Sequence, residues 1–168
     1  LLSKRSNCTV SQLIDVRLAS TAPELVGFEL SNGTQTAVAR APIAAGAWVH
    51  VAVVRDGGAA RVVVDGVAGA DVVAPSQNLA GVVAALAFGD SPCVGGADGT
   101  LRYAGSLDEL RIYDRALAAD EIVALANGGG VASSGGVTAT PSEVTPGGSL
   151  LLAAVVGGLP DGSTCDAR

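Results

Sequence analysis

Short runs of β-favouring apolar residues, separated by glycine, asparagine, aspartate and proline, follow one another along the chain. Runs of this length and composition predict β-strands, and the residues between them are typical of turns. We expect strands at residues 13–18, 25–30, 48–55, 61–65, 82–88 and 106–113. Strands this short and this frequent predict an all-β fold, a sandwich of antiparallel strands.

The clearest pair of predicted strands lies between Trp48 and Asp65. Its two valine-rich halves are joined by Asp56, Gly57 and Gly58, which predicts a β-hairpin. Because so many valines leave little polar alternation, both strands are expected at the centre of a sheet. An earlier pair of runs, followed by a turn at Asn32–Gly33, predicts another hairpin.

The run at residues 106–113 alternates in a way that predicts two different faces. One face would carry Leu107, Glu109, Arg111 and Tyr113, and the other Asp108, Leu110 and Ile112. Asp108 and Glu109 are adjacent, so on a regular strand they point to opposite faces.

One short helix is predicted at about residues 119–126, where Ile122, Leu125 and Ala126 have the spacing of a helical face. Asn127–Gly128 is a natural helix end. A helix this short is not stable alone, so we expect it to pack on the sandwich.

Composition also indicates a domain boundary. Residues 128–136 are rich in glycine and serine and predict a flexible linker between a main domain at 1–127 and the opening strands of a second β domain at 137–168. About 30 residues cannot bury a core alone.

Charge excludes some classes of partner. The net charge is −6, and no basic cluster exists beyond Lys4-Arg5, so nucleic acid is not an expected partner. No apolar stretch is long enough to insert into a membrane. The first residues lack the order of a signal peptide, so we expect any export signal or anchor to lie outside this sequence.

Three cysteines, Cys8, Cys93 and Cys165, are far apart and show no C-x-x-C spacing. This spacing argues against a zinc or redox motif, and the odd number leaves at least one cysteine without a partner in the chain. Each could also be a small buried hydrophobic residue.

Three segments together resemble the closing half of LamG-like jellyroll domains, in the concanavalin A-like group. They are WVHVAVVRDG at 48–57, VVDG at 63–66 and YAGSLDELRIYDRAL at 103–117, followed by Asp120-Glu121-Ile122. The resemblance covers about residues 1–127 and implies a jellyroll whose first strands are missing. Ala118 departs from the serine or threonine that often caps the helix in such domains, which should cost about 1 kcal/mol. From Val137 on, the chain is similar to bacterial immunoglobulin-like modules.

Some members of this group also carry a Ser-Lys-Arg-x-x-Cys start and a Cys-x-Gly-x-x-Gly loop. Ser3–Cys8 matches the first motif, and Cys93–Gly99 loosely matches the second. The resemblance therefore implies a disulfide between Cys8 and Cys93.

Catalysis is not expected. Relatives that hydrolyse β-glucans use carboxylates spaced as Glu-x-Asp-x-x-Glu on one strand, and no such triplet occurs here. The single histidine, His50, is flanked by apolar residues and predicts a packing role, since one histidine cannot build a multi-histidine zinc site. Trp48 is better explained as a core or edge anchor than as a sugar-stacking platform.

Calcium is the metal that the resemblance makes worth testing. In related jellyrolls an aspartate at the position of Asp108 often helps hold a structural calcium ion. The loop from Asp90 to Asp98 resembles in position the calcium-dependent ligand loop of pentraxins. Calcium needs several oxygen ligands, and a surface or hydrogen-bonded role for Asp108 remains the alternative.

These features predict an extracellular or cell-surface module, of bacterial origin by composition, that binds a glycan or an extracellular protein without catalysing a reaction. The alternative is a structural spacer or accessory domain in a larger secreted hydrolase or surface protein. Fold does not determine ligand, so both hypotheses rest on the resemblance.

Overall fold

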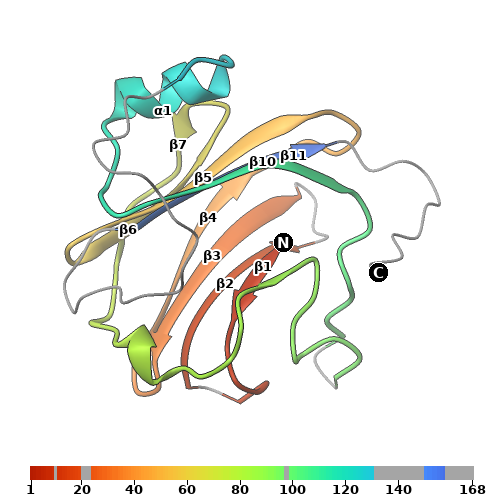
Figure 1. The fold of residues 1–168 in the computed structure, drawn as a ribbon, viewed down its shortest axis with the longest axis vertical. Coiled ribbons are helices and arrows are strands. Elements are labelled where there is room, and N and C mark those ends of the chain that lie inside the picture. The colour runs from red at the N-terminus through yellow and green to blue at the C-terminus, as the bar shows by residue number, and fades with distance from the viewer. Residues whose placement is uncertain (10, 20–23, 97–98, 131–149, 158–168) are drawn as a thin grey trace.

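The computed structural model describes residues 1–9, 11–19, 24–96, 99–130 and 150–157 of the 168-residue chain. Two antiparallel sheets pack face to face, with one helix on the outside (Figure 1). Sheet A has the order β4-β3-β2-β1-β9, and sheet B has the order β10-β11-β5-β6-β7, with β8 also pairing with β6. This architecture confirms the predicted all-β jellyroll sandwich.

The strands of sheet A are β1 (Leu2–Lys4), β2 (Gln12–Ala19), β3 (Leu25–Asn32), β4 (Thr36–Pro42) and β9 (Ala87–Phe88). Those of sheet B are β5 (Val49–Asp56), β6 (Ala59–Val64), β7 (Val67–Ala68), β8 (Val72–Val73), β10 (Ser106–Tyr113) and β11 (Leu150–Gly157). A 3₁₀ turn, η1, spans Leu79–Gly81, and the helix α1 spans Ala119–Ala126.

The main core lies between the two sheets and follows from alternation along the strands. On β3, Val26, Phe28 and Leu30 are fully buried, and on β5, Val49, Val51 and Val53 join the same cluster. Each large apolar side chain transferred from water contributes about 1.5–3 kcal/mol to folding. The alternate side chains of β3 point away from this core, so that face of the strand is free to contact a ligand.

A second, smaller core forms where α1 covers the outer face of sheet B (Figure 1). Ile122 and Leu125 of the helix pack with Ala52, Val54 and Tyr113 of the sheet. This contact supplies the stability that an eight-residue helix lacks on its own.

The helix begins with half of a capping box. Ala118 has no hydroxyl to offer, but Glu121 accepts a hydrogen bond from the Ala118 amide at 2.8 Å and forms two contacts of 2.7 Å with Arg115. The Arg115 guanidinium and the Ala118 amide lower the pKa of the Glu121 carboxyl to about 2. The predicted end of the helix is confirmed, since Gly128 follows it with a positive φ of 76°.

The predicted hairpins are confirmed, and the pattern missed the long strand β4 together with the short strands β1, β7 and β8. β2 pairs with β3, and β5 pairs with β6 across the turn at Gly57–Gly58. The turn at Asn32–Gly33 joins β3 to β4, and the Asn32 carboxamide accepts the amides of the next turn residues at 3.0 and 2.8 Å. The sequence of β4, TAVARAP, is rich in alanine, which has a weak β-propensity.

The strand predicted at residues 82–88 is wrong for most of its length, since only Ala87–Phe88 is a strand. The carbonyls of Val82 and Ala84 instead accept hydrogen bonds from the Lys4 ammonium, at 3.2 and 3.1 Å. A lysine side chain thus satisfies backbone groups that a neighbouring strand would otherwise bond.

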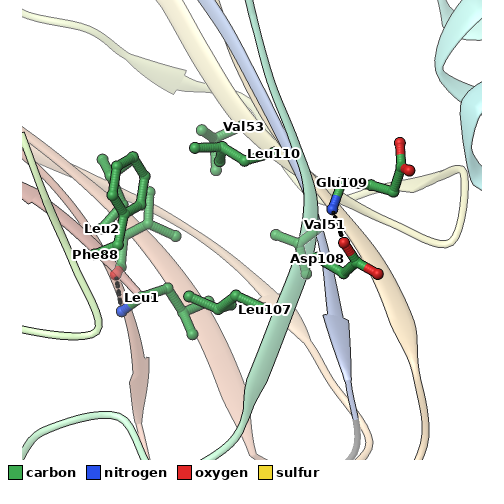
Figure 2. Close-up of a pocket in the computed structure, with 10 residues that line it drawn as sticks. Leu1, Leu2, Val51, Val53, Phe88, Leu107, Asp108, Glu109 and Leu110 are labelled. Carbon is green, nitrogen blue, oxygen red and sulfur yellow. Dashed lines mark hydrogen bonds between the residues drawn. The ribbon is translucent and has the colours of Figure 1, made fainter. Parts of the chain in front are cut away.

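A β-bulge in β10 changes the predicted faces of this strand. The register with β11 shifts between Asp108 and Arg111, and Glu109 has a positive φ of 52°. As a result Leu107 and Leu110 line the same apolar cleft, and Asp108 and Glu109 point away from it (Figure 2). Alternation predicted that Leu107 and Leu110 lie on opposite faces of the strand, and that Asp108 and Glu109 do so too. Both predictions are therefore wrong.

The segment predicted as a second domain, 137–168, contributes one described strand. The backbone of β11 pairs with β5 on one side and β10 on the other, within sheet B. The rest of this segment and residues 131–136 of the predicted linker lie outside the described residues. The division at 128–136 stays a prediction.

Candidate ligand groove on the outer face of sheet A

The Ser-Lys-Arg motif holds the loop that leads into β2. The Arg5 guanidinium donates to the Asp15 carboxylate at 2.5 Å, and both side chains are only 5% exposed. The same guanidinium donates to the carbonyls of Asn7 at 2.8 Å and Thr9 at 3.3 Å. One buried ion pair therefore shapes the whole loop that carries Cys8.

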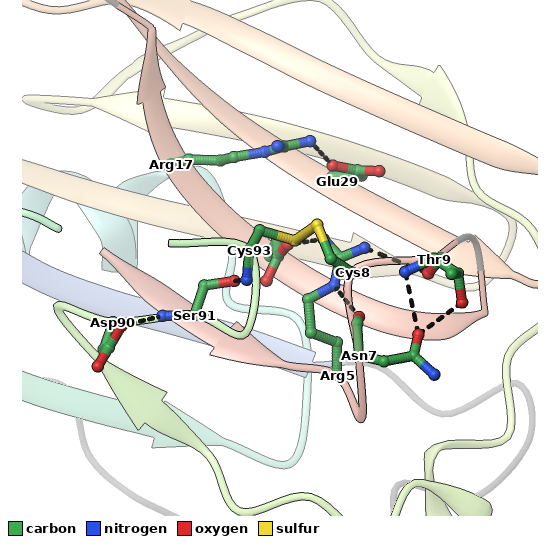
Figure 3. Close-up of a disulfide and its surroundings, with 10 residues drawn as sticks. Arg5, Asn7, Cys8, Thr9, Arg17, Glu29, Asp90, Ser91 and Cys93 are labelled. Atoms are coloured by element: carbon green, nitrogen blue, oxygen red, sulfur yellow. Dashed lines mark hydrogen bonds and ion pairs between the residues drawn. A yellow bond between two sulfur atoms is a disulfide. The ribbon is translucent and has the colours of Figure 1, made fainter. Parts of the chain in front are cut away.

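Cys8 and Cys93 form a disulfide, as the resemblance implied (Figure 3). Their Cα atoms are 4.9 Å apart although 85 positions separate them in the sequence. The bond ties the loop after β9 to the loop before β2. Two backbone hydrogen bonds order the loop after β9. The Gly95 amide donates to the Thr100 carbonyl, and the Tyr103 amide donates to the Gly89 carbonyl.

An open groove of about 710 Å³ lies between this loop and the outer face of sheet A. Its floor comes from β2, β3 and β4, one wall from residues 89–94 and 99–104, and one end from the loop at residues 43–47. Tyr103 is the one aromatic side chain among the described residues that line it. The floor carries Arg17, Gly27 and Arg40 side by side.

Charges in the groove are mostly paired. Arg17 forms an ion pair with Glu29 on the next strand (Figure 3), and Arg102 pairs with Asp90 at 3.1 Å. Arg40, which is exposed, has no carboxylate partner among the described residues. Among the described lining residues, Arg40 is therefore the guanidinium without an ion pair, and Glu24, just before β3, is the carboxylate without one.

The structure places two of the three candidate calcium ligands, and both are engaged. The Asp90 carboxylate pairs with Arg102 and accepts the Ser91 amide at 2.8 Å, and the Asp108 carboxylate accepts the Glu109 amide at 2.8 Å. Asp98 lies outside the described residues. Within the described ranges, no three His, Cys, Asp or Glu side chains gather where they could hold a metal ion. A guanidinium beside Asp90 also disfavours a cation there, so calcium binding stays a prediction.

A second concavity is apolar and lies between the edge strands β9 and β10. It has a volume of about 270 Å³ and is lined by Leu2, Phe88, Leu107 and Leu110 together with valines of β5 (Figure 2). Among the described residues that line it, only Asp108 and Glu109 carry carboxylates, and both point outward (Figure 2). The cleft offers hydrophobic contact and little that would orient a polar ligand.

His50 and Trp48 differ from each other in burial. His50 is buried on β5, and desolvation lowers the pKa of its imidazole, opposed by Asp65 and reinforced by Arg111. Its burial confirms the predicted packing role. Trp48 directly precedes β5 and is 55% exposed, so the core position offered for it is wrong and the edge position remains.

The sequence patterns missed one residue that lines the groove, Gly27, and one buried polar residue outside it, Gln77. Gln77 is buried, and its side-chain amide donates to the carbonyls of Leu13 and Ser31 at 2.6 and 2.8 Å, which fixes the loop after β8 against β2 and β3. Gly27 lies at an outward position of β3, between the buried Val26 and Phe28. An isolated glycine within a strand pattern is a signal of close approach, and it could have been noticed.

No helix in the described part of the chain is long and apolar enough to cross a membrane.

Comparison with known proteins gives a family and one solved structure. No curated protein matches the chain. A crystal structure of residues 221–444 of an S-layer domain-containing protein from Clostridium thermocellum ATCC 27405 is similar at 23% identity, with a TM-score of 0.45. The similarity covers 73% of this chain and 59% of that one. A Laminin G-like family model, described as the concanavalin A-like lectin/glucanases superfamily, matches residues 14–123, which is more than half of the chain. The chain therefore belongs to the concanavalin A-like lectin/glucanases superfamily.

Proposed function

We propose that this domain is a non-catalytic binding module that recognises a glycan or an extracellular protein in the groove on sheet A. The observation that carries the proposal is the groove itself, an open concavity beside a loop that a disulfide holds in place. Ligand sites in proteins are commonly concave and largely preformed. A laminin G-like fold supports a binding role of this kind.

The state of the acids supports binding over hydrolysis. Glycoside hydrolysis needs two carboxyl groups that converge on one bond. Among the described acids that line the groove, Asp15 is paired with Arg5 and Asp90 with Arg102, which leaves only Glu24 outside an ion pair. One unpaired carboxylate does not supply the two that hydrolysis needs, which favours a non-catalytic role.

An extracellular or surface location follows from the same proposal. Disulfides persist in oxidising compartments, and the Cys8–Cys93 bond supports such a location. The composition and the resemblance of residues from Val137 on to bacterial immunoglobulin-like modules support a bacterial, multidomain parent protein.

The alternative function is a spacer or accessory domain. It is favoured by the scarcity of aromatic side chains in the groove, where only Tyr103 is found among the described lining residues. Sugar-binding sites often stack a pyranose ring on an aromatic side chain, so a spacer would explain this scarcity.

A binding screen with two matched variants separates the two functions. The full chain would be tested by affinity electrophoresis against neutral and acidic polysaccharides and by capture on immobilised gelatin. Leu101→Glu changes an exposed residue in the groove wall, and Val83→Glu changes an equally exposed residue outside the groove, so neither should affect folding. We expect at least one ligand whose affinity falls about tenfold with Leu101→Glu and is unchanged with Val83→Glu.

Two results would contradict the binding proposal. If no probe binds, or if Leu101→Glu leaves every affinity unchanged, the groove is not the site and the spacer function is preferred.

We further propose calcium as a candidate stabilising ion, for the reasons the family resemblance gives for Asp108, Asp90 and Asp98. A ligand that binds only the native state raises the melting temperature. Calorimetry with calcium and with chelator tests this directly. Equal melting temperatures would remove calcium from consideration.

A further inference from the structure

We infer that Gly27, Arg17 and Arg40 form a carboxylate-binding subsite on the floor of the groove, suited to a uronic acid residue of a polysaccharide. This inference rests on the proposed function and adds the class of ligand.

The subsite is a row across three strands. Arg17 of β2 is the register partner of Gly27, and Gly27 is the register partner of Arg40 on β4. Neighbouring strands lie about 4.8 Å apart, so the two arginine backbones are separated by about 10 Å. All three residues line the groove. Gly27 therefore leaves a space without a side chain between the two arginine residues.

The fold itself does not require glycine at position 27. A Cβ atom placed there would meet its nearest neighbours, Val38 Cγ1 and the Arg17 carbonyl oxygen, at 3.6 and 3.8 Å, which is ordinary van der Waals contact. Its φ is not in the left-handed region, where glycine is favoured. Glycine inside a strand is usually less stable than alanine. We therefore attribute the glycine at position 27 to the open space above it, through which a ligand can approach the backbone.

The charges favour a carboxylate in this space. Arg17 is shared with Glu29, but Arg40 is exposed and has no acidic partner among the described residues. A guanidinium group binds a carboxylate through two parallel hydrogen bonds. In a chain with a net charge of −6, an unpaired arginine at the floor of a groove gives a local positive site.

The backbone favours a sugar over a peptide. A peptide often binds by adding a strand to a free sheet edge. At Gly27 the backbone of β3 is paired with β2 on one side and with β4 on the other, so it has no free edge to offer a peptide. A flat pyranose ring needs no such groups and can lie over Gly27, with its carboxylate toward Arg40 and its carbon face against Val38.

The test measures binding of the full chain to polygalacturonate by isothermal titration calorimetry. Arg40→Gln should weaken binding at least tenfold and reduce its dependence on salt. Gly27→Ala should weaken binding to a similar extent while the melting temperature stays equal or rises. Neutral, fully methyl-esterified polymer should bind the unchanged chain at least tenfold more weakly than polygalacturonate.

Two control variants lie away from the groove. Gly58→Ala changes a glycine that also has open space around it, and Arg61→Gln removes an arginine that pairs with Asp71 on sheet B. Both should bind polygalacturonate like the unchanged chain. Their behaviour separates loss of the subsite from the general effect of removing a positive charge or replacing a glycine.

Three results would overturn the inference. They are no binding of polygalacturonate, unchanged binding by Gly27→Ala and Arg40→Gln, or tighter binding of polyglutamate than of polygalacturonate, which would indicate an acidic protein as the ligand. If a neutral polysaccharide binds and remains sensitive to Leu101→Glu, the subsite fails while the groove keeps its proposed function.

Discussion

Replacing Cys8 and Cys93 together with serine, in a chain that also carries Cys165→Ser, removes the covalent link between the two loops at the groove. The bond spans 85 positions, and restricting an unfolded chain over that length is worth about 4.6 kcal/mol in the loop-entropy model. Measured values usually fall below this figure, so we expect a loss of about 3–4 kcal/mol in the free energy of unfolding. For a chain of this size the melting temperature would then fall by roughly 6–16 °C.

Urea denaturation followed by far-ultraviolet circular dichroism measures this loss. The Cys165→Ser chain would be compared with and without dithiothreitol, and the triple variant serves as the control that should not respond to the reductant. If the unfolding curves of the Cys165→Ser chain coincide in both buffers, then the disulfide does not form or does not constrain the unfolded state. The slope of the curves must also be compared, because a change in slope would show that the denatured state has altered.

Three further changes probe buried polar groups. Burial places the pKa of His50 below 6.5, so the unfolded state binds more protons; stability should be full above pH 6.5 and fall as the pH decreases below it. His50→Gln should reduce this slope in denaturant midpoints measured at pH 7.5 and 5.5. Asp15→Asn leaves the Arg5 charge buried and should cost about 3–5 kcal/mol by urea denaturation, whereas a loss below about 1 kcal/mol would mean that the pair is solvated. Gln77→Ala leaves two strand carbonyls without their donor and should cost at least about 2 kcal/mol in the same assay; an unchanged midpoint would show that water replaces the amide.

Local patterns were sufficient for most of the fold. Valine-rich runs with glycine turns predict β5 and β6 and their hairpin, because these strands are buried on both faces and their composition reflects it. The pattern fails at β4, whose buried alanines pair with the large residues Phe28 and Val26 of β3. It also fails at residues 82–88, where the Lys4 ammonium binds carbonyls that a neighbouring strand would otherwise bind. Both failures depend on contacts between segments that are distant in the sequence.

The candidate site was less accessible to sequence reasoning than the fold. The disulfide followed from a family resemblance, since spacing alone cannot pair three cysteines. The row of Arg17, Gly27 and Arg40 exists only through the register of three strands, and no local motif contains it. The bulge at Glu109 could not be predicted either, because alternation assumes one residue on each strand at each position.

The position of β11 also has a consequence for the time at which the domain can form. Leu151 pairs with Val54, roughly 100 residues earlier in the chain, and β11 is the last described strand in the sequence although it lies inside sheet B. Contacts this distant slow folding, and a ribosome adds about 5–20 residues each second. For several seconds of synthesis β5 and β10 would thus each present an edge without its partner strand. That interval is when the nascent chain would depend most on chaperones and would be most open to strand exchange with a neighbouring copy.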